Sequence, residues 1–561
     1  MLPQQCSVII VGGGPFGLML ANELGRRGIS VVLIDQKPTT AFNPQANATQ
    51  ARTMEHYRRL GFADEIRALG MPPDYPTDVA YFTRFAGYEL ARFKLPSSSQ
   101  AKEMVTRLDG SWNAAELPHR VSQKFVERVL RRHAERRPSN SINYGWRLID
   151  FEDRDGHVEA IAERVNDGTR CTVRAAYLIG ADGAHSPVRD ALGVRYEGET
   201  GVVRDFMGGR MYAIYMRAPD FYSISRHAPA WMYVTFNRNR RAFMAAVDGK
   251  TEFAFHTQLR PGEDENRIAA SDALGMFQAA VGAPIEAEIL ARQAWTAGHA
   301  LVAERFQSGR VLMGGDAVHL FTPTGGLGYN TAIEDAVNLG WKLAAVIKGQ
   351  AGGNLLESYE AERRPVARRN TAYARAFADS LGRFEAVPEI EEASPQGEAA
   401  RRRAGAYLEA HARAEFNIPG ITFGGRYDGS PIIVGDGTAP PPDDANNYSQ
   451  TACPGGRAPH LWLHGDRSLF DLFGPEWTLL RLGPKPADST ALARAAAAIR
   501  LDLRVVDIPP DEARDLYEAD LALIRPDQIV AWRGNAVPEN VEALLSRATG
   551  CLQTTSAGTG G

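Results

Sequence analysis

Hydrophobic and polar positions change their period along the chain. Near the N-terminus, apolar runs at 7–11 (SVIIV) and 30–35 (SVVLID) flank a segment, 15–28, whose apolar positions recur at helical spacing. This order predicts a strand, a helix and a second strand, which is the start of a βαβ unit. Between about 200 and 260, apolar and polar residues alternate instead, and this pattern predicts an antiparallel sheet.

Helical periodicity returns in the second half of the chain. A short strand (RVLMG) leads into a glycine-rich stretch, and a helix is predicted over 331–349, ended by Gly349. A second long helix follows and is expected to kink at Pro365. The proline-rich segment 435–447 has the composition of a linker. Short strands among helical segments beyond it predict a separate C-terminal α/β domain.

Composition narrows the class of protein. A chain of 561 residues is too long for one core, and two to four domains are expected. The net charge of −4 argues against nucleic acid as a partner. No apolar run is long enough for a membrane helix, and the N-terminus lacks the features of a signal peptide. The four cysteines form no CxxC pair, so we expect no metal site or disulfide framework and a cytoplasmic location.

The first strand–helix junction carries a dinucleotide-binding pattern. Gly12, Gly14 and Gly17 give G-x-G-x-x-G between the strand and the helix. The first glycine allows a tight turn, the second lets a pyrophosphate approach the backbone, and the third allows contact between helix and strand. Asp35, at the end of the second strand, can bind ribose hydroxyls. The pattern alone does not distinguish NAD from FAD.

Two aspartates placed after later strands complete the pattern. Asp182 follows "YLIGA", and Asp316 follows "VLMGG". The three motifs, in this order and at this spacing, resemble the class A flavoprotein monooxygenases. The chain resembles in particular the branch with phenol, 2-hydroxybiphenyl and 2,4-dichlorophenol hydroxylases and hydroxylases of aromatic polyketides. The resemblance extends to segments "NPQANATQARTMEHYRRLG", "GGLGYNTAIEDAVNLGWKLAAVIKG" and "PGGRAPHLWL".

The resemblance implies an α/β chain with a glutathione-reductase-like FAD-binding fold, an antiparallel-sheet substrate domain and a C-terminal thioredoxin-like domain. The FAD-binding parts would be 1–185, interrupted by a small sheet segment near 75–100, and 300–415, which carries the long helices. The substrate domain would be 186–299, and the thioredoxin-like domain and tail 416–561. Without a CxxC motif, thiol redox chemistry is not expected in that last domain.

The resemblance also implies the reaction. FAD would be reduced by NADPH or NADH, which docks transiently because there is no second nucleotide-binding motif. A flavin C4a-hydroperoxide formed with O2 would then hydroxylate a phenolic or polycyclic aromatic substrate. Baeyer–Villiger, decarboxylative or epoxidising oxygenation, and a non-catalytic flavin- or ligand-binding role, stay open at this point. The resemblance also allows a homodimer.

The expected cofactor site combines the motif residues with positions taken from the family. Asp316 would bind the ribityl chain, and Asp182 would serve both FAD and the passing nicotinamide. Gln45 replaces an arginine that many members use to hold the FAD phosphates, so we expect looser FAD binding. The full set of expected FAD-binding residues is Gly12, Gly14, Pro15, Gly17, Asp35, Gln36, Gln45, Gln123, Asp182, Gly315, Asp316, Pro323, Gly326, Gly328, Tyr329 and Asn330.

Three residues are candidates for contact with the substrate. Asn47 lies where branch members place a histidine or aspartate near the substrate hydroxyl, and an asparagine can orient a hydroxyl but cannot act as a base. Tyr215 could face the substrate from the sheet, although a half-buried sheet aromatic explains it as well. Pro323 would shape the loop beside the flavin and the substrate. The weaker candidates are Tyr212, His227, Tyr233 and Arg241, whereas His185 and His319 are interpreted as local structural residues.

Overall fold

The computed structural model describes residues 2–200, 206–237 and 239–551. Its first layer is a sheet in which β17, β8, β1, β2 and β5 run parallel in that order. Both faces of these strands are covered, which explains their nearly continuous apolar sequences. The strands are β1 (Gln5–Val11), β2 (Val31–Asp35), β5 (Asn140–Tyr144), β8 (Arg170–Gly180), β16 (Gln307–Ser308) and β17 (Val311–Met313), with the antiparallel hairpin β6 (Trp146–Arg154) and β7 (His157–Arg164).

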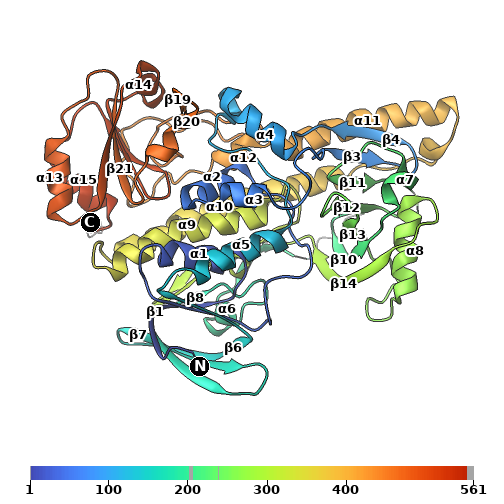
Figure 1. Ribbon diagram of the computed structural model, residues 1–561, viewed down its shortest axis with the longest axis horizontal. Coiled ribbons are helices and arrows are strands. Elements are labelled where there is room, and N and C mark those ends of the chain that lie inside the picture. The colour runs from blue at the N-terminus through green and yellow to red at the C-terminus, as the bar shows by residue number, and fades with distance from the viewer. Residues whose placement is uncertain (1, 201–205, 238, 552–561) are drawn as a thin grey trace, which may run out of the picture.

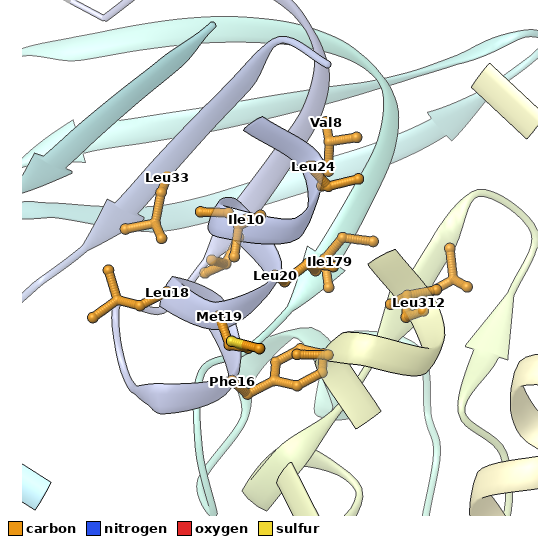
Figure 2. Packing of buried hydrophobic residues seen from close by; sticks show 14 of the residues in the cluster. Val8, Ile10, Phe16, Leu18, Met19, Leu20, Leu24, Leu33, Ile179 and Leu312 are labelled. Carbon is orange, nitrogen blue, oxygen red and sulfur yellow. The ribbon is translucent and has the colours of Figure 1, made fainter. Parts of the chain in front are cut away.

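Helix α1 (Pro15–Gly25) lies against this sheet as the predicted βαβ unit requires. Side chains of α1, among them Leu20 and Leu24, pack with those of β1, β8 and β17 in one buried cluster (Figure 2). Two further helices, α5 (Gln123–Glu135) and α9 (Leu327–Ile347), pack on α1. The sheet and the α1 layer form the base on which the glycine-rich turns are placed.

The second sheet has the order β14-β10-β13-β12-β11-β3-β4 and is mostly antiparallel, as the alternating pattern predicts. The small sheet segment near 75–100 is part of it, because β3 pairs in parallel with β11. Helix α8 (Ala270–Val281) packs on its outer face (Figure 1). The strands are β3 (Val79–Phe82), β4 (Glu89–Phe93), β10 (Gly209–Arg217), β11 (Met232–Thr235), β12 (Ala242–Ala246), β13 (Glu252–Gln258) and β14 (Glu288–Ala297).

The long helices differ from the predictions at their ends. Helix α9 begins at Leu327, so Tyr329 and Asn330 lie inside its first turn rather than before it. Helix α10 (Asn354–Gly382) is one continuous helix through Pro365, and α11 (Pro395–Phe416) follows. The remaining elements of this region are α2 (Ala51–Leu60), α3 (Ala63–Arg67), α4 (Ser98–Met104), α6 (Pro187–Ala191), α7 (Phe221–Ser225), α12 (Pro419–Phe423) and the small sheet β9 (Tyr196–Glu199), β15 (Ala300–Ala303) and β18 (His319–Leu320).

The C-terminal region is a separate α/β layer, seen at one end of the molecule in Figure 1. Its sheet has the order β22-β21-β23-β24, with β21 and β22 parallel and the other pairs antiparallel. The strands are β21 (Trp477–Leu482), β22 (Leu503–Ile508), β23 (Leu521–Ile524) and β24 (Val530–Gly534), and the helices are α13 (Thr490–Ala498), α14 (Asp511–Tyr517) and α15 (Val541–Ala548). No helix in the described ranges is long and apolar enough to cross a membrane.

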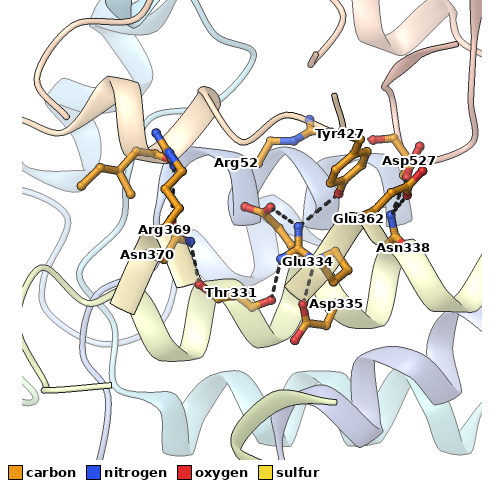
Figure 3. Close-up of polar contacts among 12 residues, drawn as sticks. Arg52, Thr331, Glu334, Asp335, Asn338, Glu362, Arg369, Asn370, Tyr427 and Asp527 are labelled. Atoms are coloured by element: carbon orange, nitrogen blue, oxygen red, sulfur yellow. Dashed lines mark hydrogen bonds and ion pairs between the residues drawn. The ribbon is translucent and has the colours of Figure 1, made fainter. Parts of the chain in front are cut away.

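A buried charge cluster joins this region to α9 and α10. The Glu362 carboxylate accepts hydrogen bonds from Arg525, Lys342 and Asn338 at 2.6–2.7 Å. Burial opposes ionisation of Glu362, but the Arg525 and Lys342 cations outweigh it and hold the pKa of this carboxyl well below its usual range. Figure 3 shows Glu362 and Asn338 turned toward Asp527, which pairs with Arg525. The charges therefore fix how the C-terminal layer docks on the long helices.

Candidate functional site

The turn between β1 and α1 shows why each glycine is present. Gly12 has φ of +118°, and a Cβ there would lie 2.0 Å from the carbonyl oxygen of Ala181. A Cβ at Gly17 would lie 2.0 Å from the carbonyl oxygen of Gly12. A Cβ at Gly14, in contrast, meets nothing within 4 Å. Packing thus requires Gly12 and Gly17, whereas Gly14 borders open space at the N-terminus of α1, where Pro15 is the first helical residue.

This open space has the polar groups that a dinucleotide needs. Helix α1 has no side-chain cap, so the N–H groups of its first turn are free to bind an anion. Asp35 is held in place at the end of β2, because it accepts hydrogen bonds from the N–H groups of Gly13 at 2.7 Å and Lys37 at 2.8 Å. Gln36 next to it is exposed. The residues present therefore fit the ADP half of FAD.

The two later aspartates differ in their surroundings. Asp316 lies in a short turn after β17, where its backbone carbonyl accepts a 2.6 Å hydrogen bond from Tyr196. Its carboxylate is exposed and bonds to no residue of the described chain, so it is available to a ligand. Asp182, in contrast, accepts hydrogen bonds from Ser186 at 2.5 Å and from the N–H of Val188 at 2.9 Å. Its carboxylate oxygens thus already shape the turn into α6.

A buried triad holds the turn of Asp316 from behind. His319 donates from Nε2 to Asp335 Oδ2 at 2.7 Å, and Arg363 donates to Asp335 Oδ1 at 2.7 Å. Burial opposes ionisation of Asp335, but Arg363 and His319 outweigh it and lower the pKa of its carboxyl. All three side chains are fully buried. His319 therefore has a local structural contact, whereas His185 is exposed.

The glycine-rich turn before α9 is packed against protein. Gly325 and Gly326 have φ of +63° and +65°, in the left-handed region that favours glycine. A Cβ at Gly326 would lie 2.8 Å from Ala48 Cβ, and one at Gly325 would lie 3.2 Å from the ring of Phe377. Gly328 faces Phe321 in the same way, at 3.3 Å. These contacts alone account for the density of glycines, and a contact of their backbone with a flavin ring stays a prediction.

Asn330 ties this turn to the segment before α2. Its Nδ2 donates to the carbonyls of Gly326 at 2.6 Å and Ala48 at 2.9 Å, and its Oδ1 accepts from the N–H of Gln50 at 2.8 Å. The Tyr329 hydroxyl contacts that of Tyr57 at 2.5 Å. Both side chains therefore bind protein groups, and only their backbone atoms stay available for a cofactor. Pro323, just before the turn, is exposed.

Gln45 and Gln123 lie together at the start of α5, and the segment that carries Asn47 is bonded there as well. The N–H of Gln123 donates to the carbonyl of Ala46 at 2.7 Å, which fixes this segment on the first turn of α5. The Gln123 amide also reaches Gln45 Oε1 at 3.4 Å and Glu127 at 2.7 Å. Asn47 Oδ1 is buried and has no hydrogen-bond partner among the described residues. An unpartnered buried acceptor is costly, and it suits a ligand that donates a hydrogen bond.

Tyr215 belongs to a charged group that the sequence does not reveal. Its hydroxyl accepts a hydrogen bond from Lys124 Nζ at 2.5 Å and donates to Glu252, and its ring meets Phe42 edge-on at 5.6 Å. Burial raises the pKa of Tyr215 and lowers that of Lys124. Lys124 stands in the first turn of α5, where a cation is unfavourable, and this mismatch is the only sequence signal for the group.

The inner face of the second sheet is the face that segment 41–47 crosses. Strand register puts Tyr215 in one cross-strand row with Ala291, Ala254 and Ala245, and the neighbouring row holds Gln293, Ala213, His256 and Phe243. Asn43 reaches Gln293 at 3.5 Å, so the segment crosses this face. Ala245 and Ala254 are buried, so the open part of this face is the second row, where Ala213, Phe243 and His256 are half-buried and Gln293 is exposed.

Alternation puts Tyr212 and Tyr233 on the opposite face, which packs with α8. His227 also belongs there, because its ring packs on Phe82 and its Nε2 donates to the carbonyl of Gly87 at 2.8 Å. Arg241 contacts the carbonyl of Phe384. His256 and Gln293 are the residues of the inner face that sequence reasoning did not select.

Comparisons with known proteins agree with this geometry. Residues 5–374 match the family model described as FAD binding domain, and residues 451–551 match that of the aromatic-ring hydroxylase C-terminal domain. The chain is 30% identical to a FAD-dependent monooxygenase of Emericella nidulans over 97% of this chain and 90% of that protein. It is 32% identical to aklavinone 12-hydroxylase of Streptomyces peucetius, covering 88% of this chain and 96% of that one.

Solved structures give the same result for the fold. RebC-10x, native and K252c bound, superposes with a TM-score of 0.88 at 32% identity, covering 98% of this chain and 100% of that one, and RebC is a rebeccamycin biosynthetic enzyme. An aklavinone-11 hydroxylase in complex with FAD and aklavinone superposes with a TM-score of 0.81 at 27% identity, with coverages of 98% and 100%.

Proposed function

Because the chain belongs to the family of FAD-dependent aromatic-ring hydroxylases and is a flavoprotein monooxygenase, we propose that it hydroxylates a polycyclic phenol bound on the inner face of the second sheet. The observation that carries this proposal is the buried, unpartnered Asn47 Oδ1, on the segment that joins α5 to that face. An acceptor in this position suits the hydroxyl of a phenol. O2 as oxidant and a homodimer belong to the same proposal.

FAD, the cofactor of this family, supplies activated oxygen when it is reduced by a nicotinamide and bound here. The open space at Gly14 and the N-terminus of α1 would take the pyrophosphate, and Asp35 the adenosine ribose. The free carboxylate of Asp316 would take the ribityl hydroxyls. The side-chain amides of Gln45 and Gln123 meet, with Gln123 Nε2 3.4 Å from Gln45 Oε1, and there they would border the flavin. No side chain of this group is a cation, so the FAD phosphates would be held by helix N–H groups without a charged partner.

The sheet topology supports two finer fold assignments that belong to the same proposal. A parallel sheet with β1–α1–β2 at its centre and a β6–β7 hairpin supports a glutathione-reductase-like FAD-binding region. The order β22-β21-β23-β24 with flanking helices supports a thioredoxin-like C-terminal domain. Cys453 is buried and Cys551 is exposed. No other cysteine lies three positions from either, as a CxxC motif requires, so thiol redox chemistry is not expected in this domain.

The chain's own residues would bind and orient the phenol. The side-chain oxygen of Asn47 would accept a hydrogen bond from the substrate hydroxyl without removing its proton. Tyr215 is a poor acid and a poor base, because burial and its bond to Glu252 raise its pKa. The substrate phenol would therefore have to ionise by its own acidity. Electron-withdrawing substituents that lower the phenol pKa should speed hydroxylation until that pKa reaches the pH of the assay. A hydroxylation rate independent of the phenol pKa would contradict this step.

A direct test uses the purified protein loaded with FAD. Substituted naphthols and hydroxyanthraquinones are screened for stimulation of NADPH oxidation, with hydrogen peroxide measured in parallel. The proposal predicts that at least one polycyclic phenol stimulates oxidation and yields a product with one added hydroxyl. A protein that takes up no flavin under saturating FAD, or that produces only peroxide with every compound, would overturn it. A ring-opened or ring-expanded product would show a different oxygenation.

A further inference from the structure

Among the residues that the structure describes, His256 is the one imidazole on the inner face, and its ring is fixed in place. It lies parallel to the ring of Phe243 on the neighbouring strand, with centroids 4.4 Å apart and planes 5° apart. Trp295 lies on β14, two strands from the β13 strand of His256, and its indole Nε1 donates a hydrogen bond to His256 Nδ1 at 3.3 Å. A stacking partner and a hydrogen bond thus hold both the plane and the rotation of the imidazole.

These contacts also settle the proton on the imidazole. The indole N–H of Trp295 is a donor only, so His256 Nδ1 must be the acceptor. Burial lowers the pKa of His256 to about 4, and the ring is neutral near pH 7. In the neutral ring the remaining proton is on Nε2. Nε2 bonds to no residue of the described ranges and is not among the buried unpartnered atoms, so it is an open donor.

The open donor lies on the sheet face that segment 41–47 crosses, and the unpartnered acceptor Asn47 Oδ1 belongs to the same segment. His256, Ala213 and Gln293 form one cross-strand row, and Asn43 of segment 41–47 touches Gln293. With strands spaced about 4.8 Å apart, His256 lies about 10 Å from the strand that this segment reaches. A span of this size matches two or three fused aromatic rings better than a single phenol ring.

We infer that His256 donates from Nε2–H to a carbonyl oxygen of the substrate, and that the enzyme selects polycyclic aromatics carrying a hydroxyl at one end and a carbonyl on the ring system. This inference rests on the proposed function, because it deepens the description of the same site. A donor for the carbonyl and an acceptor for the hydroxyl give two polar contacts of opposite kind, which fix the orientation of a flat ring system. Trp295 is a positioning residue, since it acts through the tautomer of His256.

The test compares two probes that differ in the carbonyl. The probes are 2-hydroxyanthraquinone and 2-hydroxyanthracene, and binding to the FAD-loaded enzyme is followed by the perturbation of the flavin spectrum. One hydrogen bond corresponds to about a tenfold preference for the quinone. His256→Phe keeps a flat ring on Phe243 but has no donor, so the preference should disappear. His256→Gln restores an N–H near the position of Nε2 and should recover most of it.

Two further variants separate recognition from structure. Trp295→Phe removes the donor to Nδ1 and lets the imidazole proton exchange between Nδ1 and Nε2. The preference for the quinone should therefore fall from about tenfold to about threefold. His227→Phe removes an imidazole from the opposite face and should leave the preference unchanged. Bound FAD per protein and the thermal unfolding midpoint are recorded for each variant. If His256→Phe holds no FAD, Trp295→Phe and His256→Gln still decide the result.

The outcomes are distinct. The inference is overturned if the wild type binds both probes equally, binds neither, or if His256→Phe keeps the preference for the quinone. The proposed function fails independently if no aromatic compound stimulates NADPH oxidation by the wild type. Binding with a lost preference in His256→Phe, together with product formation by the wild type, supports both.

Discussion

The side-chain oxygen of Asn330 accepts a hydrogen bond from the backbone N–H of Gln50 at 2.8 Å, across 280 residues of sequence. Asn330 also donates to Ala48 and Gly326. One amide thus joins the glycine-rich turn of α9 to the segment that carries Gln45 and Asn47. The geometry of the expected flavin site depends on this junction.

Asn330→Ala should weaken both the fold and the FAD site. It leaves a buried N–H and two carbonyls without partners, which costs about 2–4 kcal/mol. We expect a lower unfolding midpoint for the apoprotein and weaker FAD binding by equilibrium dialysis. Asn338→Ala, which removes a buried amide far from segment 46–50, is the control: it should lower the midpoint but not the FAD affinity. Equal FAD affinity in Asn330→Ala and the wild type would contradict the assigned role of the junction.

Gly14→Ala and Gly17→Ala should have opposite effects. Gly14 has φ of −82° and open space around its Cβ position, so alanine should leave the apoprotein's unfolding midpoint unchanged. The added methyl would enter the space of the pyrophosphate and weaken FAD about tenfold or more. Gly17→Ala would clash with the Gly12 carbonyl and destabilise the apoprotein itself. FAD titrations and thermal unfolding distinguish the two, and normal FAD affinity in Gly14→Ala would place the pyrophosphate elsewhere.

Gln45→Arg should tighten FAD binding. Gln45 is exposed and contacts only Gln123 among the described residues, so an arginine can be accommodated. An added cation near the phosphates is worth a gain of about two- to fivefold in affinity at low salt. The gain should vanish in 1 M salt, because screening removes it. Gln45→Met serves as the uncharged control. An unchanged dissociation constant at low salt would show that Gln45 does not face the phosphates.

Histidines that are neutral in the folded protein should make stability depend on pH. Burial lowers the pKa of His119 and His460 to about 3 and that of His256 to about 4. In the unfolded chain these groups titrate near 6.5, so the unfolded state binds more protons below that pH. Stability should therefore fall as pH falls from 6.5 toward 5, by up to about 1.4 kcal/mol per pH unit for each histidine.

Urea unfolding at pH 7.0 and 5.5 measures this dependence. His460→Gln should lose the share of one histidine in the pH dependence, since the His460 imidazole bonds only to Asn113 and Ser468 among the described residues, and its backbone N–H, which donates to Gln450 Oε1, is kept. The unfolding midpoint of the wild type should be lower at pH 5.5 than at 7.0. A midpoint that does not move between these two pH values would mean that the histidines are protonated in the folded protein.

The sequence predicted those parts of the site that depend on residues close together in the chain. The β1–α1–β2 unit and the positions of Asp35 and Asp316 at the ends of their strands lie where the sequence puts them. Each depends on neighbouring residues or on a short strand–turn–helix unit. The family, the FAD cofactor and the monooxygenase activity are confirmed by the comparisons.

Long-range pairing accounts for what the sequence did not show. The pairing of β3 with β11 joins residues about 150 positions apart, and no local pattern encodes it. The bond from Lys124 to Tyr215 crosses from the first sheet's helix layer to the second sheet. His256 becomes a candidate only when strand register puts it on the inner face with Gln293. The start of α9 at Leu327 was missed because glycines at 325, 326 and 328 read as a loop.

The most direct test of the central claim follows oxygen from O2 into the product. The FAD-loaded enzyme is supplied with NADPH, a polycyclic phenol that stimulates NADPH oxidation, and 18O-labelled O2, and the product is analysed by mass spectrometry. The account predicts one labelled oxygen atom in a ring hydroxyl for each NADPH consumed productively. A product without label, or NADPH oxidation that yields only labelled hydrogen peroxide with every phenol, would contradict it.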